Sequence, residues 1–379
     1  MTNWKINNVN MNKWIEFQTT NNYKISENTI DNYYLKKWYY YKNLAKGPLN
    51  VVIDITRFCN LRCKHCSEKE SLNRGEMSID TFELILNNLL YANVYRIIIT
   101  GGEPLIHRDI MKIIKKIKDY GFALTILTNL NISTKKLESI IKLTNLMEDK
   151  IQISIDDVFE EYEFMRMGAD FKLLEKNMKF LKEKGINTKV NMVITKWNYT
   201  NMPKVLKFCS ENNVKSLRFT PYFGRDREEI APLFEELVPA YDETLSTYEK
   251  LGTKVSIDVD PIPLVYPIFE KLKENSDFKF QTDYMMCPAC VSSIDIDING
   301  DVFPCSYLHV TKFKCGNVLE QPIVEIWNSQ IAKNFRKFVS DDEKCNSCSQ
   351  HEKCRGGCKA SIFTCEMGTH DSNCDKECI

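Results

Sequence analysis

Three cysteines lie close together in the stretch FCNLRCKHC, where Cys59, Cys63 and Cys66 follow the spacing C-x3-C-x2-C. Three thiolates at this spacing can ligate three irons of a [4Fe-4S] cluster and leave the fourth iron open to a substrate or a cofactor. A zinc knuckle is the alternative, but zinc prefers a fourth close ligand, and His65, between two of the cysteines, cannot easily turn its ring to the same ion. The spacing therefore favours an iron-sulfur cluster with one open iron.

A second group of cysteines lies in the carboxyl-terminal quarter of the chain, where residues 287–379 hold eleven of the fifteen. Short strand-like runs and turn residues surround them, as is typical of a small module organised by metal rather than by a large core. Cys345 to Cys358 read C-x2-C-x5-C-x3-C, and Cys290 to Cys305 read C-x9-G-x4-C. A structural zinc ribbon would explain the first pattern but would leave the second without a role.

The bulk composition is that of a globular protein. Of the 379 residues 43% are hydrophobic, and 51 basic residues balance 51 acidic ones, so the charge gives no indication of a nucleic-acid partner. The amino terminus lacks the apolar core of a signal peptide, and no apolar run approaches the roughly 20 residues that cross a bilayer. We expect a cytoplasmic protein with no membrane partner, in which the cysteines ligate metal rather than form disulfides.

Strand-like runs alternate with helical periodicity between residues 50 and 222. A Ser78 cap precedes one helical pattern, and Gly121 ends another. This alternation predicts an α/β fold in which a parallel sheet curls toward a partial barrel of six β/α units. The predicted strands lie at 51–56, 95–100, 122–128, 151–156, 188–195 and 216–222.

Two of these strands are followed by residues that could do chemistry. The three-cysteine segment follows the strand at 51–56, and the stretch TGGEP, residues 100–104, follows the next strand. The carboxyl ends of parallel strands meet at one edge of a sheet, where active sites of such folds lie. We therefore expect the cysteines and TGGEP to face the same opening of the barrel.

The chain divides into four predicted parts. An aromatic-rich cap precedes the barrel, a charged helical stretch with an extra strand at 254–260 follows it, and a small cysteine-rich α+β domain ends the chain. The boundaries are 1–49 for the cap, 50–225 for the barrel, 226–286 for the helical bridge and 287–379 for the cysteine-rich domain.

The pairing of C-x3-C-x2-C after the first strand with GGEP after the second resembles the radical SAM superfamily. This resemblance implies a partial (β/α)6 barrel of the radical SAM type. It also implies that the amino and carboxylate groups of S-adenosylmethionine chelate the open iron. One-electron reduction then breaks a carbon-sulfur bond and yields a 5′-deoxyadenosyl radical, which removes a hydrogen atom from the substrate.

The same resemblance suggests residues that contact S-adenosylmethionine. Glu103 would accept hydrogen bonds from the methionine amino group, with Gly101 and Gly102 allowing close backbone approach. Ser154 and Asp156 would lie near the ribose. For Asp156, Arg166 and Asn191 a solvated or capping role is the alternative. The remaining candidates are Arg166 for the methionine carboxylate, Asn191 for the adenosine, and His65 in the place of an aromatic ring against adenine.

The carboxyl-terminal cysteine patterns resemble the SPASM extension of radical SAM enzymes, which holds two auxiliary [4Fe-4S] clusters. With the radical-generating cluster, this implies three clusters. In the second auxiliary cluster the fourth ligand would be Cys374, with Cys365 and Cys378 as the alternatives. Cys209, which lies outside both patterns, fits a small core residue. Cys315 and Cys365 could donate a hydrogen atom, although a buried thiol is the simpler interpretation. The ligands implied are Cys287, Cys290, Cys305 and Cys358 for the first auxiliary cluster, and Cys345, Cys348, Cys354 and Cys374 for the second.

The resemblance implies a substrate class but not a substrate. Most often it is a ribosomally made peptide that is oxidised or crosslinked, and we expect such a substrate, with a flavodoxin- or ferredoxin-type reductant. The 49-residue cap is short for a leader-binding domain, so we expect leader recognition either by a separate leader-binding protein or by this short aromatic cap. Oxidation or decarboxylation of a haem precursor is the alternative. Ser306 stands where sulfatase-maturing relatives carry an Asp that acts as a base, which disfavours sulfatase maturation. The iron left open at the three-cysteine cluster disfavours a protein that only carries electrons.

Overall fold

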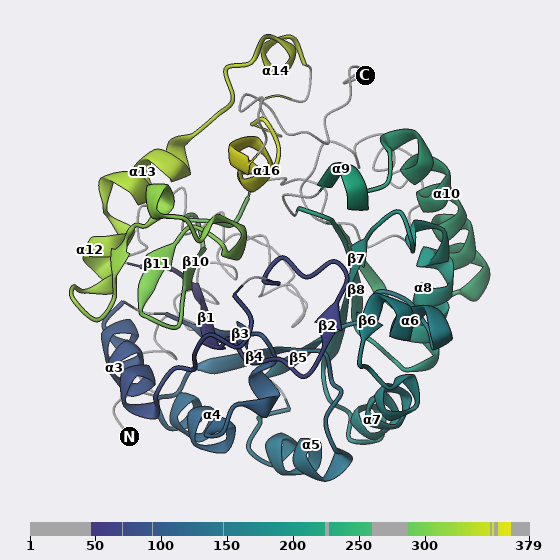
Figure 1. The fold of residues 1–379 in the computed structure, drawn as a ribbon, viewed down its shortest axis with the longest axis horizontal. Helices are drawn as coiled ribbons and strands as arrows, with labels where there is room; N and C mark the ends of the chain where they lie inside the picture. Colours follow the sequence, from purple (N-terminus) through teal and green to yellow (C-terminus); the bar gives the residue numbers. More distant parts are fainter. Residues whose placement is uncertain are drawn as a thin grey trace, which may run out of the picture.

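The computed structural model describes residues 47–259 and 287–364, apart from gaps at 70, 93, 147, 224–226, 349–350 and 352–354. The predicted cap therefore lies almost wholly outside the described residues, as do Cys354, Cys365, Cys374 and Cys378. The strands form a ten-stranded sheet in the order β12-β11-β10-β1-β3-β4-β5-β7-β8-β9. Figure 1 shows this sheet curling around a central space, with helices packed against its outer side.

The six strands predicted for the barrel are all present and pair in parallel. Each lies within two residues of its predicted bounds, and the extra strand predicted at 254–260 is also found, pairing in parallel with the last barrel strand. The strands are β1 (Asn50–Thr56), β3 (Arg96–Gly101), β4 (Ala123–Thr128), β5 (Lys150–Ser154), β7 (Thr188–Ile194), β8 (Ser216–Pro221) and β9 (Ser256–Val259).

Helices cover the outer side of the sheet (Figure 1). The first of them begins where the sequence predicts, because the Ser78 side chain accepts a hydrogen bond from the Thr81 amide, an N-cap worth about 1 kcal/mol. The helices are α3 (Ile79–Leu90), α4 (Ile110–Asp119), α5 (Thr134–Ile141), α6 (Phe159–Met165), α7 (Phe171–Glu183), α8 (Met202–Glu211), α9 (Arg227–Ile230) and α10 (Phe234–Leu251).

The core lies between the sheet and these helices. On β1, Val51, Ile53 and Ile55 are fully buried in it, and burying each such side chain contributes about 1.5–3 kcal/mol. Side chains alternate across a strand, so Val52 and Asp54 point the other way, into the barrel. The interior of the barrel therefore receives the polar residues of strands whose outer faces are apolar.

The carboxyl-terminal domain continues the barrel sheet, although the sequence predicts it as a separate module. Its first strand, β10 (Ser293–Ile296), pairs in parallel with β1, and β11 (Asp301–Phe303) and β12 (Gly316–Asn317) follow antiparallel. This pairing satisfies the backbone groups of β1, which would otherwise form an exposed edge. The helices of this domain are α12 (Ile323–Trp327), α13 (Gln330–Lys337), α14 (Glu343–Ser347) and α16 (Lys359–Thr364).

A second contact fixes the carboxyl-terminal domain to the barrel. The Asn88 side chain on α3 donates hydrogen bonds to the carbonyls of Val318 and Gln321 and accepts one from the Ile323 amide. In the described part of the chain no helix combines the length and apolar character needed to span a membrane.

Candidate active site

The three-cysteine segment crosses the carboxyl end of the barrel. It leaves β1 and forms a short strand, β2 (Arg62–Cys63), which pairs antiparallel with β6 (Arg166–Met167) after α6. In this pairing Cys63 lies opposite Arg166. The side chain of Asn60 adds a second tie, because it donates to the Asn131 carbonyl at 2.8 Å. The segment is thus held to β1, to the loop after β4 and to β6.

The thiols of Cys59, Cys63 and Cys66 are partly buried and close to one another. Burial raises the pKa of each thiol, and the charge of a neighbouring thiolate raises it further. Metal binding removes this penalty because it deprotonates and neutralises the thiols together. No three His, Cys, Asp or Glu side chains among the described residues converge on one ion.

The two glycines of GGEP allow close contact within the protein itself. Gly101 has φ +133°, and a Cβ there would lie 2.1 Å from the Thr56 carbonyl oxygen; a Cβ on Gly102 would lie 2.3 Å from that of Phe58. The amides of Gly102 and Glu103 donate to these same carbonyls at 2.8 Å. The close approach expected toward the cofactor is therefore found, in this structure, toward the segment that leads to Cys59.

Glu103 is fully buried where β3 and β4 end. Its carboxylate accepts hydrogen bonds from the Leu105 amide at 2.9 Å, the Thr128 hydroxyl at 2.8 Å and the Asn129 amide at 2.7 Å. Burial raises the pKa of Glu103, and these donors oppose the shift. A carboxylate has about four acceptor positions, so these bonds leave one for a further donor. Its contact with the methionine amino group stays a prediction.

Asp156, Arg166 and His65 form a buried charged group beside Cys63. Arg166 Nη2 lies 2.7 Å from Asp156 Oδ2, and His65 Nε2 lies 3.1 Å from the same oxygen. The other carboxylate oxygen accepts from the Val193 amide, and Arg166 Nη1 lies 3.7 Å from Cys63 Sγ. The side chains of Asp156 and Arg166 are 0% and 7% exposed, which excludes the solvated role that the sequence left open for them.

The charges in this group stabilise one another. Burial acts to raise the pKa of Asp156, but Arg166 and His65 together hold it well below its usual range. Burial likewise acts to lower the pKa of Arg166, but Asp156 and the Cys63 thiolate outweigh this effect and hold the pKa above its usual value. Both groups are therefore ionised at neutral pH. Their predicted contacts with S-adenosylmethionine, and that of the His65 ring, remain predictions.

Two nitrogens of this group, Arg166 Nε and His65 Nδ1, are buried without a hydrogen-bond partner among the described residues. An unpaired buried donor costs free energy, so a bound acceptor would stabilise this arrangement. A carboxylate suits an arginine N–H because the hydrogen bond is charge-assisted. The donor set at the cysteine segment thus fits S-adenosylmethionine, whose carboxylate would meet Arg166.

Ser154 and Asn191 are paired neighbours near the carboxyl ends of β5 and β7. Asn191 alternates on β7 with the core residues Val190 and Met192, so its side chain lies on the interior side of the sheet, where it accepts a hydrogen bond from the Thr220 hydroxyl at 2.8 Å. Lys189, which is not among the residues predicted from the sequence, lies on the same face. The alternation of Lys189 and Asn191 with Val190 in TKVNMVI is the signal that would have identified it.

The described cysteines of the carboxyl-terminal domain fall into two places. Burial raises the pKa of Cys305, and the charge of Cys287 raises it further. The pKa of Cys290 is raised by its hydrogen bond with Cys315 and by burial, and to a smaller extent by Cys287, so Cys287, Cys290 and Cys305, three predicted ligands of one cluster, lie near one another. Cys315 is itself a buried thiol. The other assignments stay predictions. Cys345 lies on α14, Cys348 follows that helix directly, and Cys358 directly precedes α16, whereas Cys354 and Cys374 are outside the described residues.

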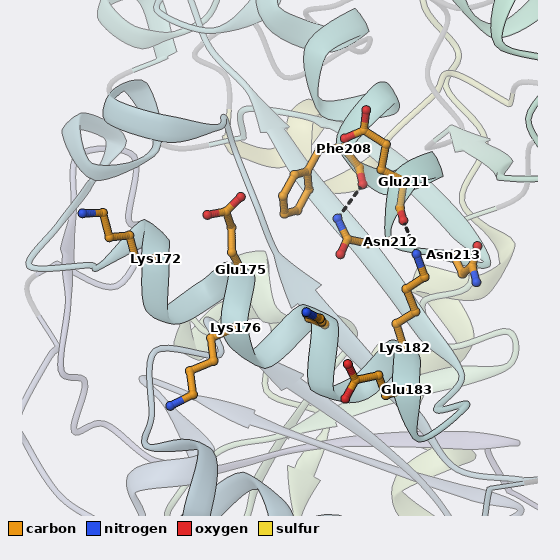
Figure 2. A pocket seen from close by; sticks show the side chains of 10 residues that line it. Lys172, Glu175, Lys176, Lys182, Glu183, Phe208, Glu211, Asn212 and Asn213 are labelled. Atoms are coloured by element: carbon orange, nitrogen blue, oxygen red, sulfur yellow. Dashed lines mark hydrogen bonds between the residues drawn. The ribbon is translucent and has the colours of Figure 1, made fainter.

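Cys209 and the outer helical layer lie away from the three-cysteine segment. Cys209 is fully buried on α8 in the core, as predicted. Figure 2 shows an open hollow between α7 and α8, lined mainly by charged side chains. Lys182 Nζ there donates to the Glu211 carbonyl and Asn212 donates to that of Phe208. This hollow lies on the outer helical layer and has no part in the site at the cysteines.

Two family models match the chain. The model of the radical SAM superfamily matches residues 53–209, and that of the SPASM iron-sulfur cluster-binding domain matches residues 287–355. Together they cover the cysteine segment, GGEP, Arg166 and the C-x9-G-x4-C pattern of Cys290 to Cys305.

Characterised relatives match at low identity over most of the chain. The AdoMet-dependent heme synthase of Nitratidesulfovibrio vulgaris is 24% identical over 326 residues, covering 82% of this chain and 87% of the relative. The PqqA peptide cyclase of Xanthomonas axonopodis pv. citri is 23% identical over 351 residues, covering 89% and 90%. The crystal structure of Streptococcus suis SuiB bound to precursor peptide SuiA has the same fold, with a TM-score of 0.73 and 21% identity, covering 97% and 87%.

Proposed function

We propose that this protein, which belongs to the radical SAM superfamily and carries a C-terminal SPASM domain, oxidatively modifies or crosslinks a ribosomally synthesised peptide. The observation that carries its radical chemistry is the buried contact of Arg166 with Asp156 and Cys63. It places a fixed cation with an unpaired N–H beside a three-cysteine segment. A carboxylate that also ligates an iron at this segment would find its counter-charge there.

Each residue of the site has a role in this proposal. The three cysteines hold a [4Fe-4S] cluster, Arg166 binds the methionine carboxylate, and Glu103 accepts from the amino group. Asp156 keeps Arg166 charged and fixes its orientation. When bound and reduced by one electron, S-adenosylmethionine supplies a 5′-deoxyadenosyl radical that takes a hydrogen atom from the substrate. Ser154 and Asn191 line the interior where ribose and adenine would lie.

Two auxiliary clusters complete the proposal. Cys287, Cys290, Cys305 and Cys358 would hold one, and Cys345, Cys348, Cys354 and Cys374 the other, for three clusters in all. With four protein ligands each, they suit electron transfer better than substrate binding. They would accept the electron that the oxidised substrate gives up. A flavodoxin- or ferredoxin-type protein would supply the first electron, in the cytoplasm, where thiols stay reduced.

The peptide substrate is supported by the names of the relatives. One is a peptide cyclase, and SuiB is seen with its precursor peptide. A separate leader-binding protein would present the peptide. The second candidate is a haem precursor, which the similarity to a heme synthase favours. Lys189 and Arg218, on neighbouring strands β7 and β8, would then be placed near the carboxylates of such a precursor.

A direct assay separates the two candidates. The anaerobically reconstituted protein is incubated with S-adenosylmethionine, dithionite and synthetic peptides encoded by short reading frames beside its gene. A peptide that loses two hydrogen atoms as 5′-deoxyadenosine forms supports the proposal. If no peptide changes while a porphyrin carboxylic acid loses carbon dioxide, the haem alternative replaces it. The Cys59→Ala, Cys63→Ala, Cys66→Ala triple variant is the control, and it should form no 5′-deoxyadenosine.

A further inference from the structure

A buried charged cluster joins β1 to the carboxyl-terminal domain. It contains Asp54 on β1, Asp295 on β10 and His309 after the 3-10 turn η4 (Ser306–Leu308), together with Arg57 and Glu68 from the cysteine segment. Asp54 and Asp295 are 5% and 2% exposed. None of these residues has a role in holding S-adenosylmethionine in the proposal above.

The cluster is a chain of contacts that ends at Asp54. His309 Nε2 lies 3.0 Å from Asp295 Oδ1, and its Nδ1, which has no hydrogen-bond partner among the described residues, lies 3.9 Å from Asp54 Oδ2. The ring of His309 stacks on Phe303, with 4.6 Å between centroids. Arg57 Nη2 lies 3.2 Å from Asp54 Oδ2, and Arg57 also pairs with Glu68. The imidazole is thus fixed between two carboxylates.

Asp54 lies on the interior side of the barrel near its reactive end. Its neighbours Ile53 and Ile55 are fully buried on the helix side, so the alternation of the strand directs Asp54 inward. It pairs in register with Thr100, directly before GGEP, and it precedes Cys59 by five residues. A substrate positioned for hydrogen abstraction at this end of the barrel would lie on the same side of the sheet.

A purely structural contact between the two domains is the simpler interpretation, but the buried charges balance only while His309 carries a proton. Asp54 and Asp295 are buried beside Arg57 and His309, whereas the third carboxylate, that of Glu68, is 33% exposed. Burying an unmatched carboxylate is costly, so when His309 is neutral one of the two aspartates gains by taking up a proton. The cluster is therefore built to exchange a proton as well as to join two domains.

We propose that Asp54 is the general base that accepts a proton from the substrate, and that His309 and Asp295 are positioning residues behind it. This inference rests on the proposed function, because the proton comes from the peptide. In the step an X–H bond of the peptide breaks, an O–H bond forms on Asp54, and the electron pair stays on the substrate. No electron is transferred, so the step needs no oxidant of its own.

The electrostatics suit this role. Burial, and the charge of Asp295, raise the pKa of Asp54 to about 7, while Arg57 and His309 act in the opposite direction and Glu68 adds a small further increase. A general base works best when its pKa is near the pH of operation. Asp54 would be partly ionised, and able to take up a proton, at neutral pH.

The test compares Asp54→Asn with Asp149→Asn, which removes a buried, ion-paired carboxylate at the opposite end of the barrel. The peptide that the assay under Proposed function identifies is used as the substrate, and the ratio of modified peptide to 5′-deoxyadenosine is measured. It should fall about 100-fold or more in Asp54→Asn and stay at the wild-type value in Asp149→Asn. A ratio for Asp54→Asn within threefold of wild type would overturn the inference. If wild type modifies no peptide, the proposed function fails and this inference fails with it.

A second variant tests the proposal if Asp54→Asn does not fold or does not retain its iron. His309→Gln removes a cation that lowers the pKa of Asp54, so the rise of peptide modification with pH should move to higher pH. If the cluster only joins the two domains, His309→Gln would lower the amount of folded protein, and the pH at half-maximal rate would stay at the wild-type value. An unchanged pH profile in folded His309→Gln therefore refutes the proposal.

Discussion

Replacing Arg166 by Gln tests the buried charged group most directly. The change leaves Asp156, whose side chain is 0% exposed, ionised and without its guanidinium partner. Removing one partner of a buried ion pair costs about 3–5 kcal/mol. The double variant Arg166→Gln, Asp156→Asn removes both charges, so it should regain most of that loss. Anaerobic urea denaturation, followed by circular dichroism, measures the midpoints of wild type and of these two variants.

The same variant also tests the binding role of Arg166. A hydrogen bond to a charged group contributes about 1.5–3 kcal/mol, so calorimetry should show S-adenosylmethionine binding about 10- to 150-fold more weakly. The double variant should recover stability but not this affinity, which separates folding from binding. If the double variant is no more stable than Arg166→Gln, the pairing argument is wrong. If the affinity of Arg166→Gln equals that of wild type, Arg166 does not hold the carboxylate.

Further predictions follow from the same site. Glu103→Gln should weaken S-adenosylmethionine binding while iron content stays near wild type, and unchanged binding by calorimetry would contradict its role. Gly102→Ala should displace the cysteine segment, because its Cβ would lie 2.3 Å from the Phe58 oxygen; a measured loss of about four irons is expected. The stabilisation from Asp156, whose folded pKa is depressed, is present above its unfolded pKa of about 3.9 and is lost as pH falls toward the folded value. Acid titration of unfolding should therefore be flatter for Asp156→Asn, and equal slopes would refute this. Iron content should fall from about twelve to about eight in the triple variant Cys59→Ala, Cys63→Ala, Cys66→Ala.

Local signals explain why the barrel was predictable. Apolar strands alternate with capped helices, and each strand and helix leaves its mark within a short window of sequence. Ser78 caps α3 where predicted, and Cys209 is a core residue. The cysteine spacing and GGEP indicated the chemistry for the same reason, because their ligating groups are close in sequence.

Contacts between distant segments were not predictable in this way. Nothing local to β10 specifies that it pairs with β1, since an edge strand offers backbone groups to any partner in register. The alternation of Asp54 with buried isoleucines shows that it faces inward, but only the pairing of β1 with β10 brings Asp295 and His309 to it. The β2-β6 pairing, which places Arg166 opposite Cys63, is another such contact.

The sequence by itself determined the strand and helix order, the three-cysteine segment and the carboxyl edge at which it lies, because short-range periodicity and topology suffice for these. Only the tertiary structure decided that Arg166 and Asp156 are a buried ion pair rather than solvated residues, and that Asp54 belongs to a cluster shared by two domains. Burial and charge pairing depend on every segment that covers a side chain. These properties therefore emerge only when the distant strands of the sheet are paired in register.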